Sequence, residues 1–159
     1  SVNATGGWYD AGDHGKYVVN GGISLWTMQN QYERALVNGF AEKYADGKLA
    51  IPEDSNGYPD LLDEARFEME WMLKMQIKSG TYSGLAYHKI HDIKWTALAI
   101  SPADASAKMD RVILPPTTAA TLNLAACAAQ SYRLWKDIDP AFAKECLDAA
   151  KSAYEAAKK

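Results

Sequence analysis

The sequence predicts an all-α protein with long loops and one short extended segment. Four stretches of the 159-residue chain carry apolar residues at helical spacing, while strand-prone residues gather between positions 81 and 100. Helices that are apolar on more than one side are followed by a helix that is apolar on one face only. Two concentric rings of helices produce such an alternation, so the pattern is compatible with part of an (α/α) barrel.

The first predicted helix spans residues 20–36, because Leu25, Met28 and Tyr32 recur at spacings of three and four residues. Glycine, proline and mixed charge then predict a loop over residues 38–57, with at most a short helical turn. This loop separates the first helix from the second.

The second helix is predicted to begin with Asp60 as its N-cap and to end near Gly80. Its apolar residues form two stripes, one of which contains Phe67 and Trp71, so the helix requires neighbours on two sides. Residues 81–100 are predicted to form a short extended or hairpin segment.

The proline-bounded residues 101–116 predict a long loop of the kind that lines a site on a helical scaffold. A third helix, capped by Thr117 or Thr118 and running through Trp135, is alanine-rich and apolar almost all round, which predicts deep burial. The dipeptide Asp139-Pro140 predicts the start of a fourth, amphipathic helix with one face in solvent. Three tryptophans lie in the helical stripes and are expected in the core: Trp26, Trp71 and Trp135.

Composition excludes several classes of partner. The 17 basic and 20 acidic residues give a net charge of −3, without a basic and aromatic patch for nucleic acid. No stretch approaches the roughly 20 apolar residues of a membrane span, and the N-terminus carries no signal peptide. We therefore expect a soluble protein without nucleic-acid or membrane partners. Cys127 and Cys146 are expected to be buried packing residues, not a disulfide framework.

The richest chemistry lies in the run Gly6-Gly7-Trp8-Tyr9-Asp10-Ala11-Gly12-Asp13-His14-Gly15-Lys16-Tyr17. Two carboxylates three residues apart can hold and deprotonate one water, and aromatic rings offer flat faces to a sugar. Gly7, Gly12 and Gly15 are expected to give the backbone positive φ and a close approach to a ligand. The run predicts a site that cleaves glycosidic bonds, although aspartates in a Gly-rich turn also serve to bind backbone N–H groups.

This run resembles the Asp-Ala-Gly-Asp segment of glycoside hydrolase family 9, the inverting cellulases and endoglucanases built on an (α/α)6 barrel. Further segments of the chain look like family 9 in the same order, so the resemblance covers nearly all of residues 1–159: they are 17–23, 59–65 and 117–122. The resemblance implies a partial catalytic domain with about four of the barrel's twelve helices. It also implies a secreted protein acting on β-glucan or cello-oligosaccharides.

By the same resemblance, Asp13 is the general base and Asp10 its partner in orienting the attacking water. Trp8, Tyr9 and Trp95 are expected to stack on sugar rings, and His14 to contact the substrate or the base. A hydrogen-bonded surface histidine is an equally good interpretation of His14.

The family's catalytic acid is a glutamate near the far C-terminal end of its domain, in a region that this chain does not reach. Six of the eight glutamates here fall on predicted helices, where pairing or solvation explains them, and Glu42 and Glu53 fall in a polar loop. We therefore expect a chain that has the base but lacks the acid and is inactive alone. Because the motif begins within ten residues of Ser1 and the last residues are still helical, we expect a fragment of a larger domain.

Other interpretations stay open. Incomplete burial predicts self-association, for example by domain swapping through residues 101–116. The chain could instead be a non-catalytic carbohydrate-binding or self-assembling module, or a half-site completed by another chain. No cofactor is expected. A metal site at His88, His91 and Asp92, or a calcium site at Asp54, Asn56 and Asp60, lacks a recognised ligand spacing.

Overall fold

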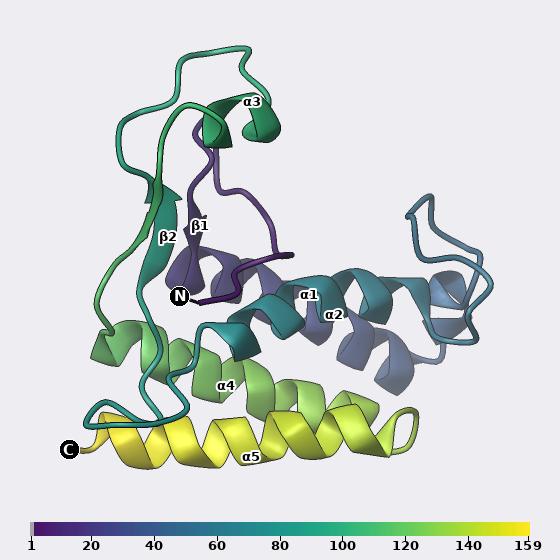
Figure 1. Ribbon diagram of the computed structural model, residues 1–159. Helices are drawn as coiled ribbons and strands as arrows, with labels where there is room; N and C mark the ends of the chain where they lie inside the picture. Colours follow the sequence, from purple (N-terminus) through teal and green to yellow (C-terminus); the bar gives the residue numbers. More distant parts are fainter. Residues whose placement is uncertain (1) are drawn as a thin grey trace.

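The computed structural model describes residues 2–159 and shows a helix-rich fold, which confirms the predicted class. Four long helices form its body, and a small sheet with a short helix stands at one end of them (Figure 1). The elements in chain order are β1 (Lys16–Tyr17), α1 (Val18–Asn38), η1 (Ala41–Tyr44), α2 (Asp60–Lys74), β2 (Lys89–Asp92), α3 (Pro102–Ser106), β3 (Arg111–Ile113), α4 (Thr118–Trp135) and α5 (Pro140–Ala157).

The contacts between the long helices centre on α1 and α4. α1 lies against α2 and α4, and α4 lies against α5, which forms the lowest layer in Figure 1. Their core centres on large, fully buried side chains such as Trp71 and Trp135. The Trp135 ring makes edge-on contacts with Tyr58 and Phe142, each with ring centroids 5.3 Å apart. Burial of Trp71 and Trp135 confirms two of the three predicted core tryptophans, whereas Trp26 is 37% exposed because the described residues leave its face of α1 uncovered.

Helix starts follow their sequence signals. The Thr117 hydroxyl accepts a 3.1 Å hydrogen bond from the Ala120 N–H and caps α4, and Asp139 caps α5 through the Phe142 N–H, also at 3.1 Å. α5 buries one face and exposes the other, as its amphipathic pattern predicts. α4 is less enclosed than expected, because Leu122 on its outer side is 42% exposed.

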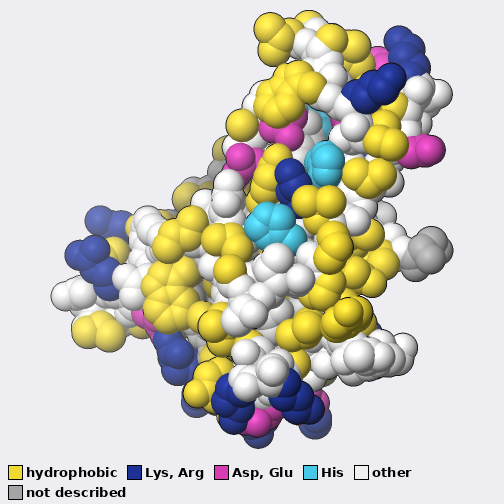
Figure 2. Space-filling view, turned by 90° about the vertical axis from the view of Figure 1, so that its left-hand side faces the viewer, with side chains coloured by type: hydrophobic (Ala, Val, Ile, Leu, Met, Phe, Trp, Pro, Cys, Tyr) yellow, Lys and Arg dark blue, Asp and Glu magenta, His cyan; other side chains and the backbone are white. Residues whose placement is uncertain are grey.

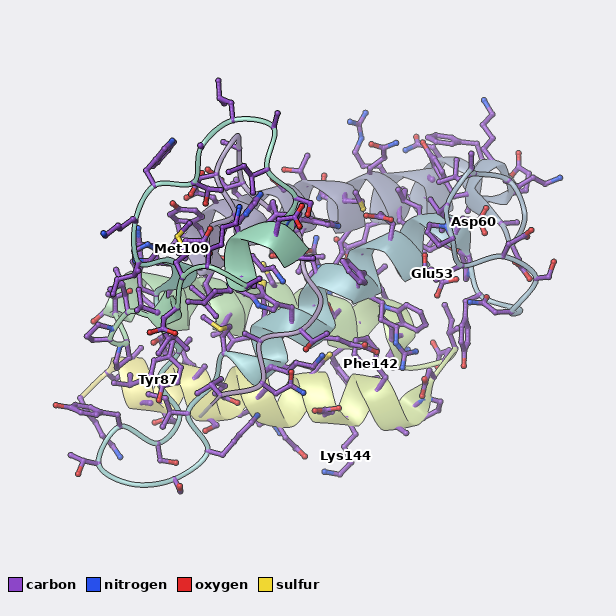
Figure 3. The ribbon with its side chains drawn as sticks, turned by 45° about the horizontal axis from the view of Figure 1, so that its top comes forward. Glu53, Asp60, Tyr87, Met109, Phe142 and Lys144 are labelled. Atoms are coloured by element: carbon purple, nitrogen blue, oxygen red, sulfur yellow. The ribbon has the colours of Figure 1, made fainter. Side chains whose placement is uncertain are left out.

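The N-terminus of α2 differs from the prediction. Pro59 is the N-cap, and Asp60 is the first helical residue, with its side chain fully buried. Its carboxylate accepts backbone hydrogen bonds from Gly47, Lys48 and Leu49 at 2.9, 2.6 and 2.5 Å. Asp60 therefore holds the preceding loop rather than its own helix end, and Figure 3 shows it at the base of that loop.

The end of α2 was also predicted wrongly. The helix stops at Lys74, and the chain then turns back, so that the N–H of Ile77 donates to the Leu85 carbonyl at 2.8 Å. Gly80, with φ +83°, lies in this turn and not at a helix end. Pairing with residues 84–86 replaces the last predicted turns of helix.

The sheet joins three segments that are far apart in the sequence. β2 pairs antiparallel with β1, placing Lys16 opposite Ile90, and with β3, placing Ile90 opposite Ile113. The predicted extended segment is thus confirmed, but the predicted loop over 101–116 contains α3 and β3. The missed signal for α3 is Ser101-Pro102 followed by Asp104, because the Ser101 hydroxyl caps the helix by accepting from the Asp104 N–H.

Two further expectations are tested by the described residues. Cys127 and Cys146 are buried and free, as predicted. Within residues 2–159, no helix combines the length and the apolar character needed to cross a bilayer.

Candidate active site

A pocket of about 260 Å³ lies where the Asp10–Gly15 loop meets the sheet. The face shown in Figure 2 has histidine side chains lying among apolar, basic and acidic ones. The residues that line the pocket are Asp13, His14, Tyr17, Lys89, His91, Asp92, Ile93, Lys94, Trp95 and Thr96. Three of the six predicted site residues, Asp13, His14 and Trp95, are therefore brought together although 82 positions separate Asp13 from Trp95.

Asp13 is the carboxylate that the fold positions in this pocket. Only 9% of the residue is exposed, and its Oδ2 accepts hydrogen bonds of 3.2 Å from the Gly15 N–H and the Tyr17 hydroxyl. Burial and the Asp13 charge raise the pKa of Tyr17, so the phenol stays protonated and donates. The side chain is thus held from one oxygen, Oδ2.

Glycine is required at position 15 for space rather than for backbone freedom. A Cβ there would lie 2.6 Å from Asp13 Oδ2 and would collide with the Tyr17 ring. Among the glycines of the motif, Gly6 and Gly7 have positive φ, whereas Gly12 and Gly15 do not. The expectation of positive φ is confirmed for Gly7 and is wrong for the other two. A Cβ on Gly12 would meet no atom within 4 Å, so its open side remains available to a ligand.

Asp10 lies at the opposite end of the same loop. Its N–H donates to the Gly15 carbonyl at 3.0 Å, which closes the loop, and its exposed carboxylate accepts a 2.8 Å hydrogen bond from Asn20 on α1. Asp10 does not line the pocket around Asp13. The site therefore has one buried and one exposed carboxylate on a closed turn.

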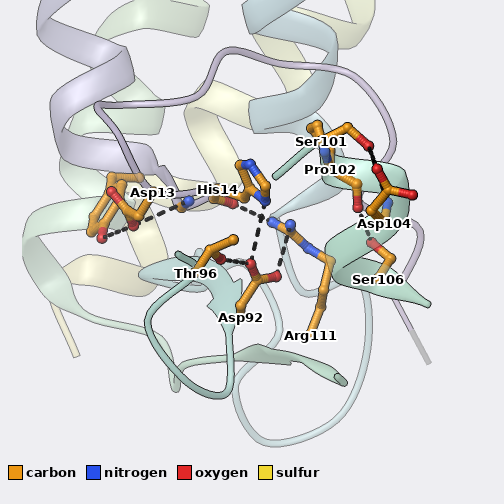
Figure 4. Close-up of polar contacts among 11 residues, drawn as sticks. Asp13, His14, Asp92, Thr96, Ser101, Pro102, Asp104, Ser106 and Arg111 are labelled. Atoms are coloured by element: carbon orange, nitrogen blue, oxygen red, sulfur yellow. Dashed lines mark hydrogen bonds and ion pairs between the residues drawn. The ribbon is translucent and has the colours of Figure 1, made fainter. Parts of the chain in front are cut away.

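His14 is surrounded by a polar cluster that joins all three strand regions (Figure 4). Its Nδ1 lies 3.4 Å from Oδ2 of Asp92, within ion-pair reach but outside hydrogen-bond geometry. Arg111 binds the other Asp92 oxygen at 3.2 Å and donates to the His14 carbonyl at 2.6 Å. The Thr96 hydroxyl donates to Asp92 Oδ2, so this buried carboxylate is fully engaged.

The three predicted sugar platforms have different surroundings. Trp95 is 77% exposed beside the pocket, and Tyr9 is 44% exposed with its ring centroid 5.5 Å from that of His14. Trp8 is partly buried against the core, and its Nε1–H donates to Glu64 at 2.7 Å. Trp95 thus presents a free face, Tyr9 is half-exposed with the Lys16 ammonium 5.2 Å from its ring centroid, and Trp8 is held by the scaffold.

Sequence reasoning assigned no role at the site to Tyr17, Lys89, Thr96 or Arg111, and it considered Asp92 only as a metal ligand. Tyr17 stood within the motif itself, and its spacing of four from Asp13 was the available signal. Arg111 had no local signal, because its partners lie 97 and 19 positions away. Lys89 places its ammonium 4.8 Å from the Tyr17 ring centroid, across the β1–β2 pair.

The suggested cation ligands are poorly suited to hold a metal. Both Asp60 oxygens accept backbone N–H groups, and Asn56 accepts from Tyr58 and donates to Asp63. Asp92 is occupied by Arg111 and Thr96. Within residues 2–159, no cluster of three His, Cys, Asp or Glu side chains has the geometry of a metal site.

Two glutamates on α2 differ from the expectation of surface pairing or solvation. Glu64 accepts the indole N–H of Trp8, and Glu68 is fully buried and accepts the Trp8 backbone N–H at 2.7 Å. Neither one lines the Asp13 pocket. The six other glutamates are also absent from the pocket lining found among residues 2–159.

A helical scaffold that holds a carboxylate beside an exposed tryptophan is compatible with the class of proteins that act on carbohydrates. Comparison with known proteins gives the family: the model of glycosyl hydrolase family 9 matches residues 1–159. The chain belongs to this family.

Two of its relatives are a cellobiosidase and an endoglucanase. The chain is 55% identical to a cellulose 1,4-beta-cellobiosidase of Acetivibrio thermocellus, with 99% of the chain and 18% of the relative covered. It is 52% identical to endoglucanase C of Cellulomonas fimi, with 98% and 14% covered. The chain therefore spans less than a fifth of the length of these two relatives.

Solved structures agree with the fold. A metagenome-derived family 9 endoglucanase superposes with a TM-score of 0.84 at 36% identity, over 96% of this chain and 26% of the other. A Bacteroides ovatus family 9 protein superposes with a TM-score of 0.81 at 39% identity, with the same shares covered. The helices described here correspond to part of the (α/α)6 barrel predicted from the sequence.

Proposed function

We propose that this chain supplies the water-activating part of an inverting β-1,4-glucanase site, with Asp13 as general base and Asp10 as its partner. The observation that carries the proposal is the position of Asp13. Its carboxylate is held by Tyr17 and Gly15 in a pocket whose rim carries the exposed ring of Trp95. A glucan chain stacked on Trp95 would bring a glycosidic bond toward this carboxylate.

Inversion requires a water between the base and the anomeric carbon, with the acid roughly 6.5–9.5 Å from the base. Glu64 and Glu68, the glutamates that contact the motif segment, are both committed to Trp8. We propose that the acid comes from residues outside this chain and that the chain alone does not hydrolyse glucan. Loss of general acid assistance costs about 10²–10⁴-fold in rate. The substrate would be a β-glucan or a cello-oligosaccharide, encountered outside the cell.

The test is release of reducing ends from a soluble β-1,4-glucan by the purified chain, with Asp13→Asn prepared identically. We expect no release by either protein, together with binding of a cello-oligosaccharide by the wild type. Hydrolysis that disappears in Asp13→Asn would show that a complete site exists and that the acid is present. Absence of both binding and hydrolysis would contradict the assignment of the pocket to glucan.

A second candidate function is carbohydrate binding without turnover. The exposed rings of Trp95 and Tyr9 favour it, since they offer sugar platforms that do not depend on a catalytic acid. A full-length protein that binds glucan but stays inactive would support this candidate over the glucanase.

We further propose that the isolated chain self-associates. A groove between α4 and α5 is lined mainly by apolar side chains, and its rim carries Leu122 and Tyr154, which are 42% and 53% exposed. On α1, Ile23 and Val37 are 61% and 86% exposed. Such surfaces seldom remain bare in soluble proteins. A swap would exchange residues 101–116, whose β3 pairs with β2; a monodisperse monomer in light scattering would refute self-association.

A further inference from the structure

A second set of contacts, outside the pocket, holds the segment that leads into Asp10 and Asp13. The segment from Thr5 to Trp8 lies along one face of α2. Four residues at successive turns form this face, and we call them the α2 cradle: Glu64, Glu68, Trp71 and Lys74. Lys74 donates from Nζ to the Thr5 carbonyl at 2.9 Å, and Glu68 and Glu64 accept the two N–H groups of Trp8, each at 2.7 Å.

Gly7 lies directly against the middle of the α2 cradle. A Cβ at this position would be 2.5 Å from Cγ of Trp71, and its φ of +73° is a conformation that favours glycine. The backbone can therefore lie flat on the indole only with glycine here. The segment is held by a side-chain contact at each turn of the helix.

Glu68 is the buried centre of this arrangement. Its side chain is fully enclosed, and a Cβ at Gly21 of α1 would collide with Oε1, so α1 approaches closely only because residue 21 is glycine. Oε1 has no hydrogen-bond partner among the described residues, and Oε2 is committed to Trp8. Burying a carboxylate with one oxygen left without a hydrogen bond destabilises the folded state, so packing alone does not account for Glu68.

Lys16 of β1 acts on the same segment. Its ammonium donates to the carbonyls of Ala4 and Gly6, so Lys16 ties the far end of the Asp10–Gly15 loop back to the residues that precede it. Burial lowers the pKa of Lys16, and the charge of Glu68 opposes that shift. The Lys16 ammonium and the Glu68 carboxylate, which carry opposite charges, thus both bind the backbone between Ala4 and Trp8.

We propose that Glu68 is a positioning residue for the Asp10–Asp13 loop, acting through the Trp8 backbone from which the loop departs. Trp8 is two residues before Asp10, and the loop is closed by the Asp10–Gly15 hydrogen bond. A fixed Trp8 and a fixed Lys16 therefore define both ends of the turn that carries the carboxylates. The catalytic meaning of this role rests on the proposed function, whereas the coupling of Glu68 to the loop does not.

The ionisation of Glu68 offers a direct readout. Burial raises the pKa of Glu68 to about 7, against the opposing effects of the Trp8 hydrogen bond and the Lys16 charge. The Lys16 charge on β1 acts on Glu68 from another element, and Glu64 and Lys74 share its helix. Burial and then the Glu68 charge raise the pKa of the Cys127 thiol on α4. A change in its charge alters the strength of the bond to Trp8.

The experiment is a pH titration of the ¹⁵N-labelled chain by NMR, without any sugar. We expect the Trp8 backbone amide to shift with a midpoint near 7, and the Asp10 and Gly15 amides to show the same transition. Glu68→Gln should abolish this transition at all three amides, while Glu70→Gln, an exposed site on the same helix, should preserve it.

Two outcomes would overturn the proposal. One is a Trp8 transition that is absent, or that persists in Glu68→Gln. The other is a Trp8 transition that depends on Glu68 while Asp10 and Gly15 do not respond, which would make Glu68 a purely local contact. If Glu68→Gln fails to fold, Lys16→Gln replaces it, and its Trp8 midpoint should rise because a nearby positive charge is lost. Cello-oligosaccharide binding by the wild type, measured separately, tests the proposed function and leaves this readout untouched.

Discussion

Arg111 donates a hydrogen bond of 2.6 Å from its guanidinium to the backbone carbonyl of His14, 97 positions earlier in the chain. The same guanidinium binds Asp92 at 3.2 Å, and Asp92 faces the His14 imidazole. One side chain on β3 thus fixes the residue next to the candidate base and the buried carboxylate beside it. The sheet, although small, connects the motif to the rest of the pocket.

Arg111→Ala should destabilise the protein, because it leaves the Asp92 carboxylate buried without its cation. We expect a loss of about 2–4 kcal/mol in the free energy of unfolding, measured by urea denaturation. Arg133→Ala is the matched control, since Arg133 is half-exposed and its pair with Glu33 should contribute less than about 1 kcal/mol. Equal losses of unfolding free energy in the two variants would show that the Arg111 cluster stabilises the fold no more than an exposed ion pair does.

Gly15→Ala and Gly12→Ala should behave differently. At position 15 the new methyl group would press on Asp13 and Tyr17, so we expect a loss of about 1–3 kcal/mol in stability and a displaced carboxylate. Gly12→Ala meets no neighbouring atom and should leave the free energy of unfolding within about 1 kcal/mol of the wild type. Any loss of cello-oligosaccharide binding in a stable Gly12→Ala protein would show that a ligand approaches this backbone. Comparable destabilisation by both would contradict the predicted asymmetry.

Patterns that act over a few residues predicted most of the helical scaffold correctly. The caps at Thr117 and Asp139 are local, since a side chain binds an N–H group three residues away. α2 was predicted less well, because Asp60 is used by a loop 11 to 13 residues earlier and the helix end is set by pairing with residues 84–86. Propensity carries no information about such distant partners.

The candidate site likewise depends both on local contacts, which the sequence predicts, and on contacts between distant residues, which it does not. Asp13 and His14 line one pocket because they are neighbours on the turn that the motif forms. Thr96 and Arg111 carry no local signal, and Asp92 was considered only as a metal ligand, because all three reach His14 only through the folded sheet. The burial of Glu68 also has no local signal, since it depends on the absence of a side chain at Gly21.

Acid should loosen the loop held by Asp60. The hydrogen bond from the Leu49 N–H, helped by those from Gly47 and Lys48, holds the pKa of Asp60 below its usual value. A carboxyl group with a lower pKa in the folded state stabilises the fold above its unfolded pKa of about 3.9 and loses that contribution as the pH falls toward the folded value. Amide exchange at residues 47–49 should therefore accelerate below about pH 4, relative to its intrinsic rate.

Asp60→Asn should show faster exchange at these amides already at pH 6, because a neutral amide oxygen is a weaker acceptor than a carboxylate. Asp54→Asn, an exposed change in the same loop, should leave them unaffected. Exchange at residues 47–49 that is insensitive to both pH and Asp60→Asn would mean that the loop is held by other contacts.

Trp95→Ala should weaken binding of a cello-oligosaccharide about tenfold, which corresponds to about 1.4 kcal/mol for one lost stacking face. The indole is 77% exposed at the pocket rim, so removing it should alter the fold little and the ligand surface greatly. Trp26→Ala is the matched control, because Trp26 is also partly exposed but lies on α1 and does not line the pocket. Calorimetric titration should show unchanged affinity for Trp26→Ala and near-recovery for Trp95→Phe. If Trp95→Ala binds as tightly as the wild type, the sugar must lie elsewhere, and Tyr9, exposed beside His14, becomes the platform to remove next.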